Sequence, residues 1–380
     1  MECTIGGTRR HLVDVARGQL AAGLEVHVIA STLRDPDFPA DLDALEAEGV
    51  HVVRLNMVRE MRPFTDLRHD KIVRHHLKRI QPDVVHTHSS KGGVLGRKAS
   101  LDTGIGARVH TPHTFAFLFS ALFGPLKRRI VRSIESYYGA RTHRTVAVSM
   151  SEATTIQRSG VVPADRVRVV SNGIDPTPFE NAESIDWTTL GVDPARPIAL
   201  LVGLVYAAKG HDLAIESLAH EGLQDVQLVC AGPGDSAEYE ALALERGVSD
   251  RVHFLGARRD VPQLLAGADL LFLPSRWEGM PYVVLEAMAA SRPIVATAVD
   301  GARDLIVDGE TGALAPEPSI DDVAHALRRV VNLPKDERLA MGRASRARLE
   351  GRASIASMVD GLSIVYAEAL EEARRETESA

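Results

Sequence analysis

The sequence predicts an α/β protein of two domains, each built on an open parallel β-sheet with helices on both faces. Its 380 residues are too many for one ordinary hydrophobic core and fit two domains. Short apolar runs alternate with helix-like segments along nearly the whole chain, which is typical of parallel strands joined by crossover helices. The alternation breaks at the turn-forming residues 172–178, which indicates the passage from one domain to the next.

The first domain is predicted to span residues 1–185. Its first helix follows Gly6 and Gly7, but the strand that should precede this turn is nearly absent, so we expect a domain that lacks its first strand. From the spacing of apolar residues, the further strands are expected at 25–30, 51–55, 82–87, 107–111, 144–149 and 167–171. The further helices are expected at 39–48, 66–80, 92–102, 120–140 and 151–159.

The second domain is predicted to span residues 186–352, with a poorly patterned stretch up to Arg196 serving as the linker. Its strands are expected at 197–203, 226–231, 252–255, 270–274, 293–297 and 312–315. Helices at 335–349 and 353–377 close the chain without a following strand, and the segment 353–380 is expected to be a separate C-terminal helix.

Charge is unevenly distributed along the chain. Residues 1–180 carry 25 basic and 19 acidic side chains, whereas the whole chain carries 44 basic and 51 acidic ones. A basic first half suggests an anionic binding partner. An anionic membrane surface or a phosphate-bearing acceptor fits better than nucleic acid, because the sequence offers no aromatic-rich platform for single strands. We therefore expect no nucleic-acid partner.

The sequence shows neither a secretory signal nor an apolar run of the ~20 residues that a membrane-spanning helix needs. Its cysteines are Cys3 and Cys230, and Cys230 lies in a predicted buried strand. A structural disulfide is therefore not expected, and a reducing cytoplasm is the simplest location. No cysteine or histidine cluster has the spacing of a zinc site, so we expect no metal.

The most informative stretch is 274–312. A buried strand ends there in a polar turn, and a helix is expected to begin at Pro281, which suits a first helical position because it has no N–H. The free N–H groups at such a helix start can bind phosphate. Glu278 before the helix and Glu286 in its second turn can accept hydrogen bonds from sugar hydroxyls. Either glutamate alone would be an ordinary surface residue, but together they frame a phosphate site, as a nucleotide sugar requires.

The spacing of these glutamates, the link 279–281 and the glycine-containing turns at 300–301 and 308–312 resemble the donor-binding region of retaining glycosyltransferases of the GT-B fold, family 4. This resemblance spans nearly the whole chain. It implies two Rossmann-like domains facing across a cleft, with the C-terminal helix crossing back to the first domain. It also implies transfer of a sugar from a nucleotide-diphosphate sugar to a glycan, lipid-linked or small-molecule acceptor, with retained configuration and without metal or cofactor.

The resemblance also implies site residues. Glu278 would hold the donor-sugar hydroxyls, Glu286 the ribose and Lys209 the diphosphate. The family usually has an arginine where this chain has Leu204, so one positive charge is missing, and Tyr206 or a nearby arginine would have to compensate. The full set of expected donor-binding residues is Gly7, Lys209, Gly232, Gly279, Met280, Pro281, Tyr282, Val283 and Glu286, with His113 and Glu278 as the catalytic residues.

Histidine-rich turns follow two predicted strands of the first domain. His113 lies where the family has a histidine that contacts the donor sugar, although a histidine satisfied by the local backbone explains the residue equally well without the resemblance. His88 and Lys91 resemble the loop that meets acceptor or phosphate groups. The segment 115–132 places phenylalanines beside basic residues, which suits either a peripheral contact with an anionic membrane or a buried core with solvated arginines.

Other functions remain open besides a transferase, which is the preferred interpretation. A nucleotide-sugar 2-epimerase shares the two-domain plan and would interconvert a nucleotide sugar without an acceptor. A phosphorylase would require inorganic phosphate. A catalytically degenerate subunit that only binds a sugar nucleotide is compatible with Leu204 and with the missing first strand.

Overall fold

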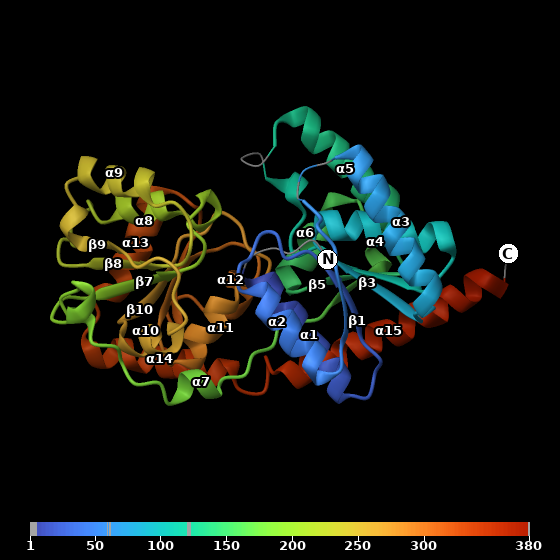
Figure 1. Cartoon of the computed structure of the whole chain (residues 1–380). Coiled ribbons are helices and arrows are strands. Elements are labelled where there is room, and N and C mark those ends of the chain that lie inside the picture. The colour runs from blue at the N-terminus through green and yellow to red at the C-terminus, as the bar shows by residue number, and fades with distance from the viewer. Residues whose placement is uncertain (1–5, 59, 61, 120–122, 379–380) are drawn as a thin grey trace. The chain divides into compact units, whose positions relative to one another are not determined.

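The computed structural model describes residues 6–58, 60, 62–119 and 123–378. The chain divides into two compact units, coloured along the sequence in Figure 1. The first unit runs to Gly173 and also includes the chain from Ile355 onward, and the second is Ile174–Ser354. The strand expected before Gly6 and the residue Cys3 both lie outside the described residues.

The passage between the units falls earlier than the predicted boundary at 185. Residues expected to form a linker belong to the second unit because their aromatic side chains are buried there. Phe179 lies in the short helix α7 (Thr177–Glu180), and Trp187 donates its indole N–H to the carbonyl of Gly267 at 3.1 Å. Burying an aromatic side chain is worth a few kcal/mol, enough to fix a segment that has no regular pattern.

All strand pairs in the described part of the first unit are parallel. β1 (His27–Ala30) pairs with β2 (His51–Arg54). A second group has the order β3 (Val84–His88), β4 (Ala107–Thr111), β5 (Arg144–Ala147) and β6 (Val167–Val169). Helix α1 (Gly7–Ala21) contributes to both groups, because Leu12 packs in the cluster around β1 while Val15 packs against β4 and β5. Each strand overlaps a predicted strand.

The helices of the first unit also follow the prediction, with one shift. They are α2 (Phe38–Glu48), α3 (Pro63–Ile80), α4 (Ser90–Thr103), α5 (Pro125–Gly139) and α6 (Met150–Ser159), with 3-10 turns at Ala116–Leu118 and Ala164–Arg166. α5 begins later than predicted because Gly124 is extended and Pro125 takes the first turn of the helix. None of the described helices is long and apolar enough to cross a bilayer.

The C-terminal helix α15 (Ile355–Glu378) belongs to the first unit, as expected. Its apolar side chains, including Met358 and Leu362, are buried in the cluster formed with β4 and β5. Glu368 accepts hydrogen bonds from Arg144 at 2.8 Å and from Arg168 at 2.7 Å. The helix therefore closes the sheet of the first unit with an apolar face and a row of ion pairs.

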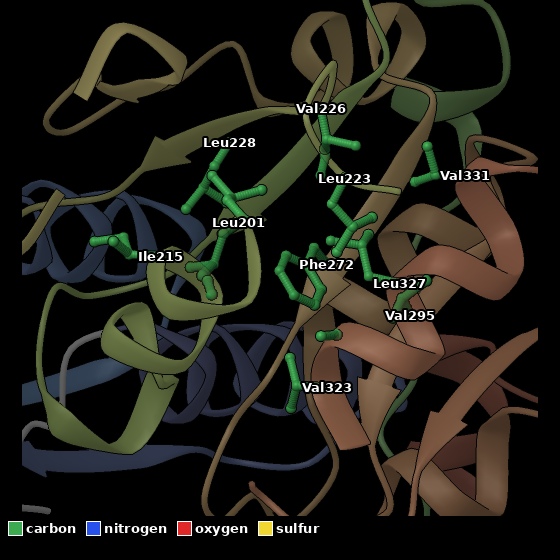
Figure 2. Close-up of a cluster of buried hydrophobic side chains, with 14 of the residues drawn as sticks. Leu201, Ile215, Leu223, Val226, Leu228, Phe272, Val295, Val323, Leu327 and Val331 are labelled. Atoms are coloured by element: carbon green, nitrogen blue, oxygen red, sulfur yellow. The ribbon is translucent and has the colours of Figure 1, made fainter. Parts of the chain in front are cut away.

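The second unit, which is described throughout, contains one six-stranded parallel sheet. Its order is β12 (Gly312–Ala315), β11 (Ile294–Thr297), β10 (Leu270–Leu273), β7 (Ile198–Val202), β8 (Gln227–Ala231) and β9 (Val252–Phe254). Figure 2 shows part of its core, in which Leu201, Phe272 and Leu327 pack together. Cys230 is buried in β8 as predicted, and burial raises the pKa of its thiol.

Helices cover this sheet on both faces, and one of them is the helix predicted to begin at Pro281. The remaining helices are α8 (His211–Ser217), α9 (Ala237–Glu245), α10 (Val261–Gly267), α11 (Tyr282–Ala289), α12 (Ala302–Leu305), α13 (Ile320–Val331) and α14 (Lys335–Leu349). Short 3-10 turns lie at Trp187–Leu190, Ala207–Lys209 and Ser249–Arg251. α8 to α12 lie between successive parallel strands, whereas α13 and α14 follow the last strand, β12.

The strand order has a change of direction beside β7. The chain runs outward from β7 through β8 to β9, and then returns to place β10 on the other side of β7. In open α/β sheets, ligands bind outside the carboxyl ends of the strands at such a point, because the loops on the two sides diverge there. The topology thus directs attention to the loops after β7 and β10.

Candidate active site

Loops from four strands of the second unit meet at this edge with their backbones in close contact. A Cβ added to Gly210, after β7, would lie 2.0 Å from the carbonyl oxygen of Pro274, after β10. A Cβ on Gly232, after β8, would lie 1.8 Å from the carbonyl oxygen of Gly203, and one on Gly301, after β11, would lie 2.3 Å from that of Gly279. Glycine is required because no side chain fits between these loops.

Lys209 and Glu278 meet at the point where the strand order changes direction. The ammonium Nζ of Lys209 donates to Oε1 of Glu278 at 2.6 Å, and the Ser275 hydroxyl donates to the same oxygen at 2.8 Å. The stem of Lys209 crosses Gly203, where an added Cβ would lie 2.9 Å from its Cε. Burial alone would lower the pKa of the Lys209 ammonium, but Glu278 outweighs that effect and the pKa is raised. A charged pair therefore occupies the edge of the sheet.

Helix α11 begins directly after this pair. Pro281 was predicted at the first helical position, but it is the N-cap, because its ψ of 119° is extended and the helix starts at Tyr282. Glu286 is half-buried, and every other residue of α11 is buried. A carboxylate on an otherwise apolar, buried helix is not an ordinary surface residue. Met280, Tyr282 and Val283 are buried beneath the turn and form its support.

An arginine lies beside the turn that contains Leu204, but it is bound elsewhere. Nη1 of Arg276 donates to the carbonyl of Ala207 at 2.8 Å, and the guanidinium pairs with both carboxylate oxygens of Asp212 at 2.8 and 2.5 Å. This fork-to-fork pairing is a strong, directional interaction. Arg276 therefore fixes the shape of the turn through Asp212 and Ala207, and Lys209 is the basic residue of the turn that pairs at the sheet edge.

In the first unit, three histidines converge from separate elements. His88 ends β3, His113 follows β4, and His11 comes from α1. Nδ1 of His88 lies 3.2 Å from Nε2 of His113, and the His11 ring centroid lies 4.7 Å from that of His113. Burial lowers the pKa values of all three imidazoles, to about 4 for His11 and well below the ordinary value for the other two. The cluster is therefore neutral at pH 7.

The backbone around this cluster is strained. His113 and Thr114 have φ values of 49° and 76°, and Ser89, next to His88, has a φ of 57°. Side chains other than glycine seldom adopt such values, and they concentrate at functional sites. Glu152 supports the turn, since its carboxylate accepts a hydrogen bond from the Thr114 N–H at 2.7 Å.

The structure does not bring every predicted residue into these groups. Lys91 is buried on α4, where its ammonium pairs with Asp66 of α3 at 2.5 Å and donates to the carbonyl of Glu60 at 2.8 Å. These contacts give it a structural role in joining two helices. Gly7 is exposed as the first residue of α1, so its backbone is accessible at the helix start.

Sequence reasoning did not single out His11 as a site residue. Its position fits the apolar stripe of α1, so the pattern gives no signal that separates it from a core residue. Ser275 and Asn172 were likewise missed, although the structure shows that Ser275 binds Glu278 and that Asn172 binds His11. A hydroxyl or an amide in a turn is too common to indicate a site from sequence alone.

The segment 115–132 has buried phenylalanines at its start and exposed apolar side chains on α5, and its contact with a membrane stays a prediction. Phe115 and Phe117 are buried in a cluster with β5 and α6, as the core interpretation requires. On α5, however, Leu126 and Ile130 are 74% and 47% exposed. Leu122 lies outside the described residues.

Two parallel α/β units of this kind make up the GT-B fold. The crystal structure of HepE from Anabaena, in complex with UDP and glucose, has the same fold, with a TM-score of 0.78 over 96% of each chain at 20% identity. The family model for Glycosyltransferase Family 4 matches residues 5–177, and that for Glycosyl transferases group 1 matches residues 188–348.

Relatives of higher sequence identity narrow the class. The chain is 33% identical over 310 residues to a D-inositol 3-phosphate glycosyltransferase of Xylanimonas cellulosilytica, covering 76% of this chain and 72% of that one. It is 28% identical over 270 residues to the UDP-Gal:alpha-D-GlcNAc-diphosphoundecaprenol alpha-1,3-galactosyltransferase of Escherichia coli, covering 67% of this chain and 68% of that one. The chain therefore belongs to the group 1 glycosyltransferases of family 4, which confirms the resemblance seen in its sequence.

The close contact between loops can be tested by adding one methyl group. Gly210→Ala should lower the free energy of unfolding by about 1–3 kcal/mol more than Gly247→Ala, because the added Cβ meets the Pro274 carbonyl. Gly247 is the matched control, since its φ of +67° equals that of Gly210 within a degree and its Cβ would meet nothing. Urea unfolding measures both, and equal losses would contradict the close contact.

Proposed function

We propose that this glycosyltransferase moves a sugar from a nucleoside diphosphate sugar to a hydroxyl of a glycan or lipid-linked acceptor, with retention of configuration and without a metal ion. The observation that carries the proposal is the Lys209–Glu278 pair at the change of strand direction, directly before α11. An ammonium beside a helix start suits a diphosphate, and a carboxylate suits sugar hydroxyls.

The charged pair suggests how the donor is held. With the site empty, Glu278 satisfies the Lys209 ammonium at 2.6 Å. A bound diphosphate offers Lys209 an anion of higher charge, which releases Glu278 to accept hydrogen bonds from the sugar. Glu286 accepts from the ribose hydroxyls one and a half helical turns later, as the family resemblance implies. Gly232 and Gly279, in the loops after β8 and β10, are assigned to the donor along the same edge, as the resemblance implies.

The same groups support the metal independence of the proposed reaction. When the bond between the anomeric carbon and the diphosphate oxygen breaks, negative charge develops on the leaving group. Lys209 and the N-terminal dipole of α11 would stabilise that charge, as a metal ion does in other transferases. Leu204 replaces a usual arginine, and Arg276 is bound to Asp212. In the proposal, Lys209 therefore supplies most of the positive charge that stabilises the leaving diphosphate.

The acceptor side is proposed for the first unit. His113 is assigned to the donor sugar near the reacting carbon and His88 to the acceptor, as the resemblance implies. No covalent nucleophile is assigned. No cofactor is invoked, since the nucleotide sugar is itself the substrate. HepE of Anabaena was crystallised with UDP and glucose, which makes uridine nucleotides the first donors to test.

Helix α5 supports a peripheral contact with an anionic membrane. Leu126, Ile130 and Tyr137 are 74%, 47% and 51% exposed, and their spacing places them along one side of the helix. Lys127, Arg129 and Arg132 are exposed around this stripe. An apolar stripe bordered by basic residues is typical of helices that lie in the membrane interface.

A basic cavity lies at the start of α5. Its volume is about 480 Å³, and Arg128 and Arg132 are fixed at its wall by hydrogen bonds to the carbonyls of Phe117 and Ser159 at 2.9 and 2.8 Å. The lining residues are Phe117, Leu118, Pro125, Arg128, Arg129, Arg132, Arg158 and Ser159. Four arginines beside apolar side chains suit the phosphate and first carbons of a lipid-linked acceptor, a class that the Escherichia coli relative's name includes.

The reaction class can be tested by NMR with UDP-glucose and UDP-galactose. An alkyl diphosphate-linked sugar serves as the acceptor, with EDTA present throughout. We expect a new glycosidic signal of the donor's α-configuration and undiminished turnover in EDTA. Interconversion of the donor without an acceptor would instead indicate an epimerase, and donor binding without turnover would indicate a degenerate subunit. A β-configured product would contradict retention.

The donor-binding assignment predicts the effect of two substitutions. Lys209→Ala and Glu286→Ala should each weaken UDP binding by about 10–100-fold, because each removes a hydrogen bond to or from a charged group. Isothermal titration calorimetry measures the affinity. Lys335→Ala and Glu317→Ala are the controls, since both residues are exposed in the same unit. Unchanged affinity in the first pair would overturn the assignment.

The membrane contact predicts binding to phosphatidylglycerol vesicles at low salt. Ile130→Glu should reduce co-sedimentation several-fold, because it places a carboxylate in the apolar stripe and opposes the attraction of ~1 kcal/mol that each nearby basic residue supplies. Leu244→Glu is the control, since Leu244 is 72% exposed on the second unit. The idea is rejected if wild-type protein stays in the supernatant, or if both variants behave alike.

A further inference from the structure

The histidine cluster of the first unit has a geometry that the sugar-transfer chemistry does not require. Nitrogen atoms of His11, His88 and His113 all lie within 4.8 Å of one another. They come from α1, from the end of β3 and from the loop after β4, so only the folded unit brings them together. The ring centroids of His11 and His88 lie 5.4 Å apart, the same separation as those of His88 and His113.

The orientation of His11 is fixed by a buried amide. Nδ1 of His11 lies 2.9 Å from Oδ1 of Asn172, and because this oxygen can only accept, Nδ1 carries the proton. The lone pair of His11 is therefore on Nε2. An outer hydrogen bond of this kind is what orients histidines that ligate metals in proteins.

Nε2 of His11 has no hydrogen-bond partner among the described residues, although it is buried and the side chain is only 1% exposed. A buried acceptor without a partner costs free energy. A ligand that accepts this lone pair would remove that cost. Nitrogens of His88 and His113 lie within 4.8 Å, and because Nδ1 of His88 and Nε2 of His113 share a hydrogen bond, a change of tautomer is what frees both lone pairs for an ion.

One of the distances between the nitrogens already fits a transition metal, and the others are at most 4.8 Å. Zinc binds imidazole nitrogen at about 2.0–2.1 Å, so two ligands of a tetrahedral ion lie about 3.3 Å apart. Nδ1 of His88 and Nε2 of His113 are 3.2 Å apart. Three protein ligands would leave a fourth position for water or for an anion.

The other histidines near this cluster or in a similar group are less suited to bind a metal, because their nitrogens already have partners or lie on the surface. Both nitrogens of His86 are occupied, by the Tyr366 hydroxyl at 2.7 Å and by the Thr111 hydroxyl at 2.8 Å. A second group, Glu25, His27 and His51, lies on the surface, where Nε2 of His27 is already bound to Glu25 at 2.7 Å. That group serves as an internal control.

We propose that His11, His88 and His113 form a binding site for one divalent transition-metal ion, with Zn²⁺ as the best-suited ion. The site would be closed on the His11 side by Asn172 and would keep one open position. All three ligands and Asn172 belong to the first unit, and Lys209 and Glu278 of the second unit are not among them. This inference replaces the expectation, based on sequence spacing, that the chain binds no metal, because the spacing rules address ligands near one another in sequence.

One consequence rests on the proposed function of His113. If His113 contacts the donor sugar, a bound ion takes the lone pair that faces the sugar, and Zn²⁺ inhibits transfer. Metal binding itself is independent of that role, so binding without inhibition would count against the assignment of His113 but leave the site in place.

Binding can be measured on tag-free full-length protein. Equilibrium dialysis against Zn²⁺, with metal analysis, should give one tightly bound equivalent, and Co²⁺ should produce the visible absorption of a tetrahedral nitrogen site. Asn172→Ala should weaken Zn²⁺ binding about 10–100-fold, as loss of an outer hydrogen bond does at known sites. His11→Ala and His113→Ala should weaken it further. The His27→Ala, His51→Ala double variant should bind like wild type.

Folding of each variant is checked by circular dichroism. His113 is only half-buried, so His113→Ala keeps the test decisive if His11→Ala fails to fold. The proposal is overturned if wild-type protein binds no equivalent, if His113→Ala and Asn172→Ala bind as tightly as wild type, or if the tight equivalent disappears in the His27, His51 double variant. A transfer assay with and without Zn²⁺ then tests the inhibition separately.

Discussion

The contact between Lys209 and Glu278 depends on the strand order of the second unit and on the glycines in the loops around it. The two residues follow strands that are remote in sequence but adjacent in the sheet, and the 2.6 Å pair forms only because β7 and β10 are neighbours. Glycines at 203, 210 and 232 let the intervening backbones touch. In the proposed function, a bound diphosphate replaces Glu278 as the partner of Lys209, and the donor sugar replaces Lys209 as the partner of Glu278.

The first unit uses buried histidines where the second uses opposite charges. Its polar residues lie at the ends of β3 and β4, next to strained backbone at Ser89 and His113. Low pKa values keep the imidazoles neutral, so they can accept hydrogen bonds or bind a metal without repelling one another. Asn172, just before the passage to the second unit, orients His11 through one hydrogen bond. A residue in a turn-rich segment thus orients a histidine on a helix 161 residues earlier in the chain.

In the first unit, α15 mainly stabilises the fold, whereas α5 mainly presents a surface. α15 supplies apolar burial and the Glu368 ion pairs that hold β5 and β6. α5 contributes little to the core on its outer side, where Leu126 and Ile130 remain exposed among basic residues. Exposed apolar side chains are unfavourable on a helix that only packs a core. Their exposure supports the proposed contact of α5 with an anionic lipid layer.

The sequence by itself determined the fold class, nearly all strands and helices, and the family, because these depend on the period of apolar residues and on local motifs such as the glutamates 278 and 286. It also located the polar turns. Only the tertiary structure decided which of their side chains meet. It paired Lys209 with Glu278, bound Arg276 to Asp212, gave Lys91 a structural role and moved the unit boundary to Gly173. Above all, it brought His11 to His88 and His113. Contacts between residues some 75 to 100 positions apart follow from strand order and helix packing, which a local pattern does not encode.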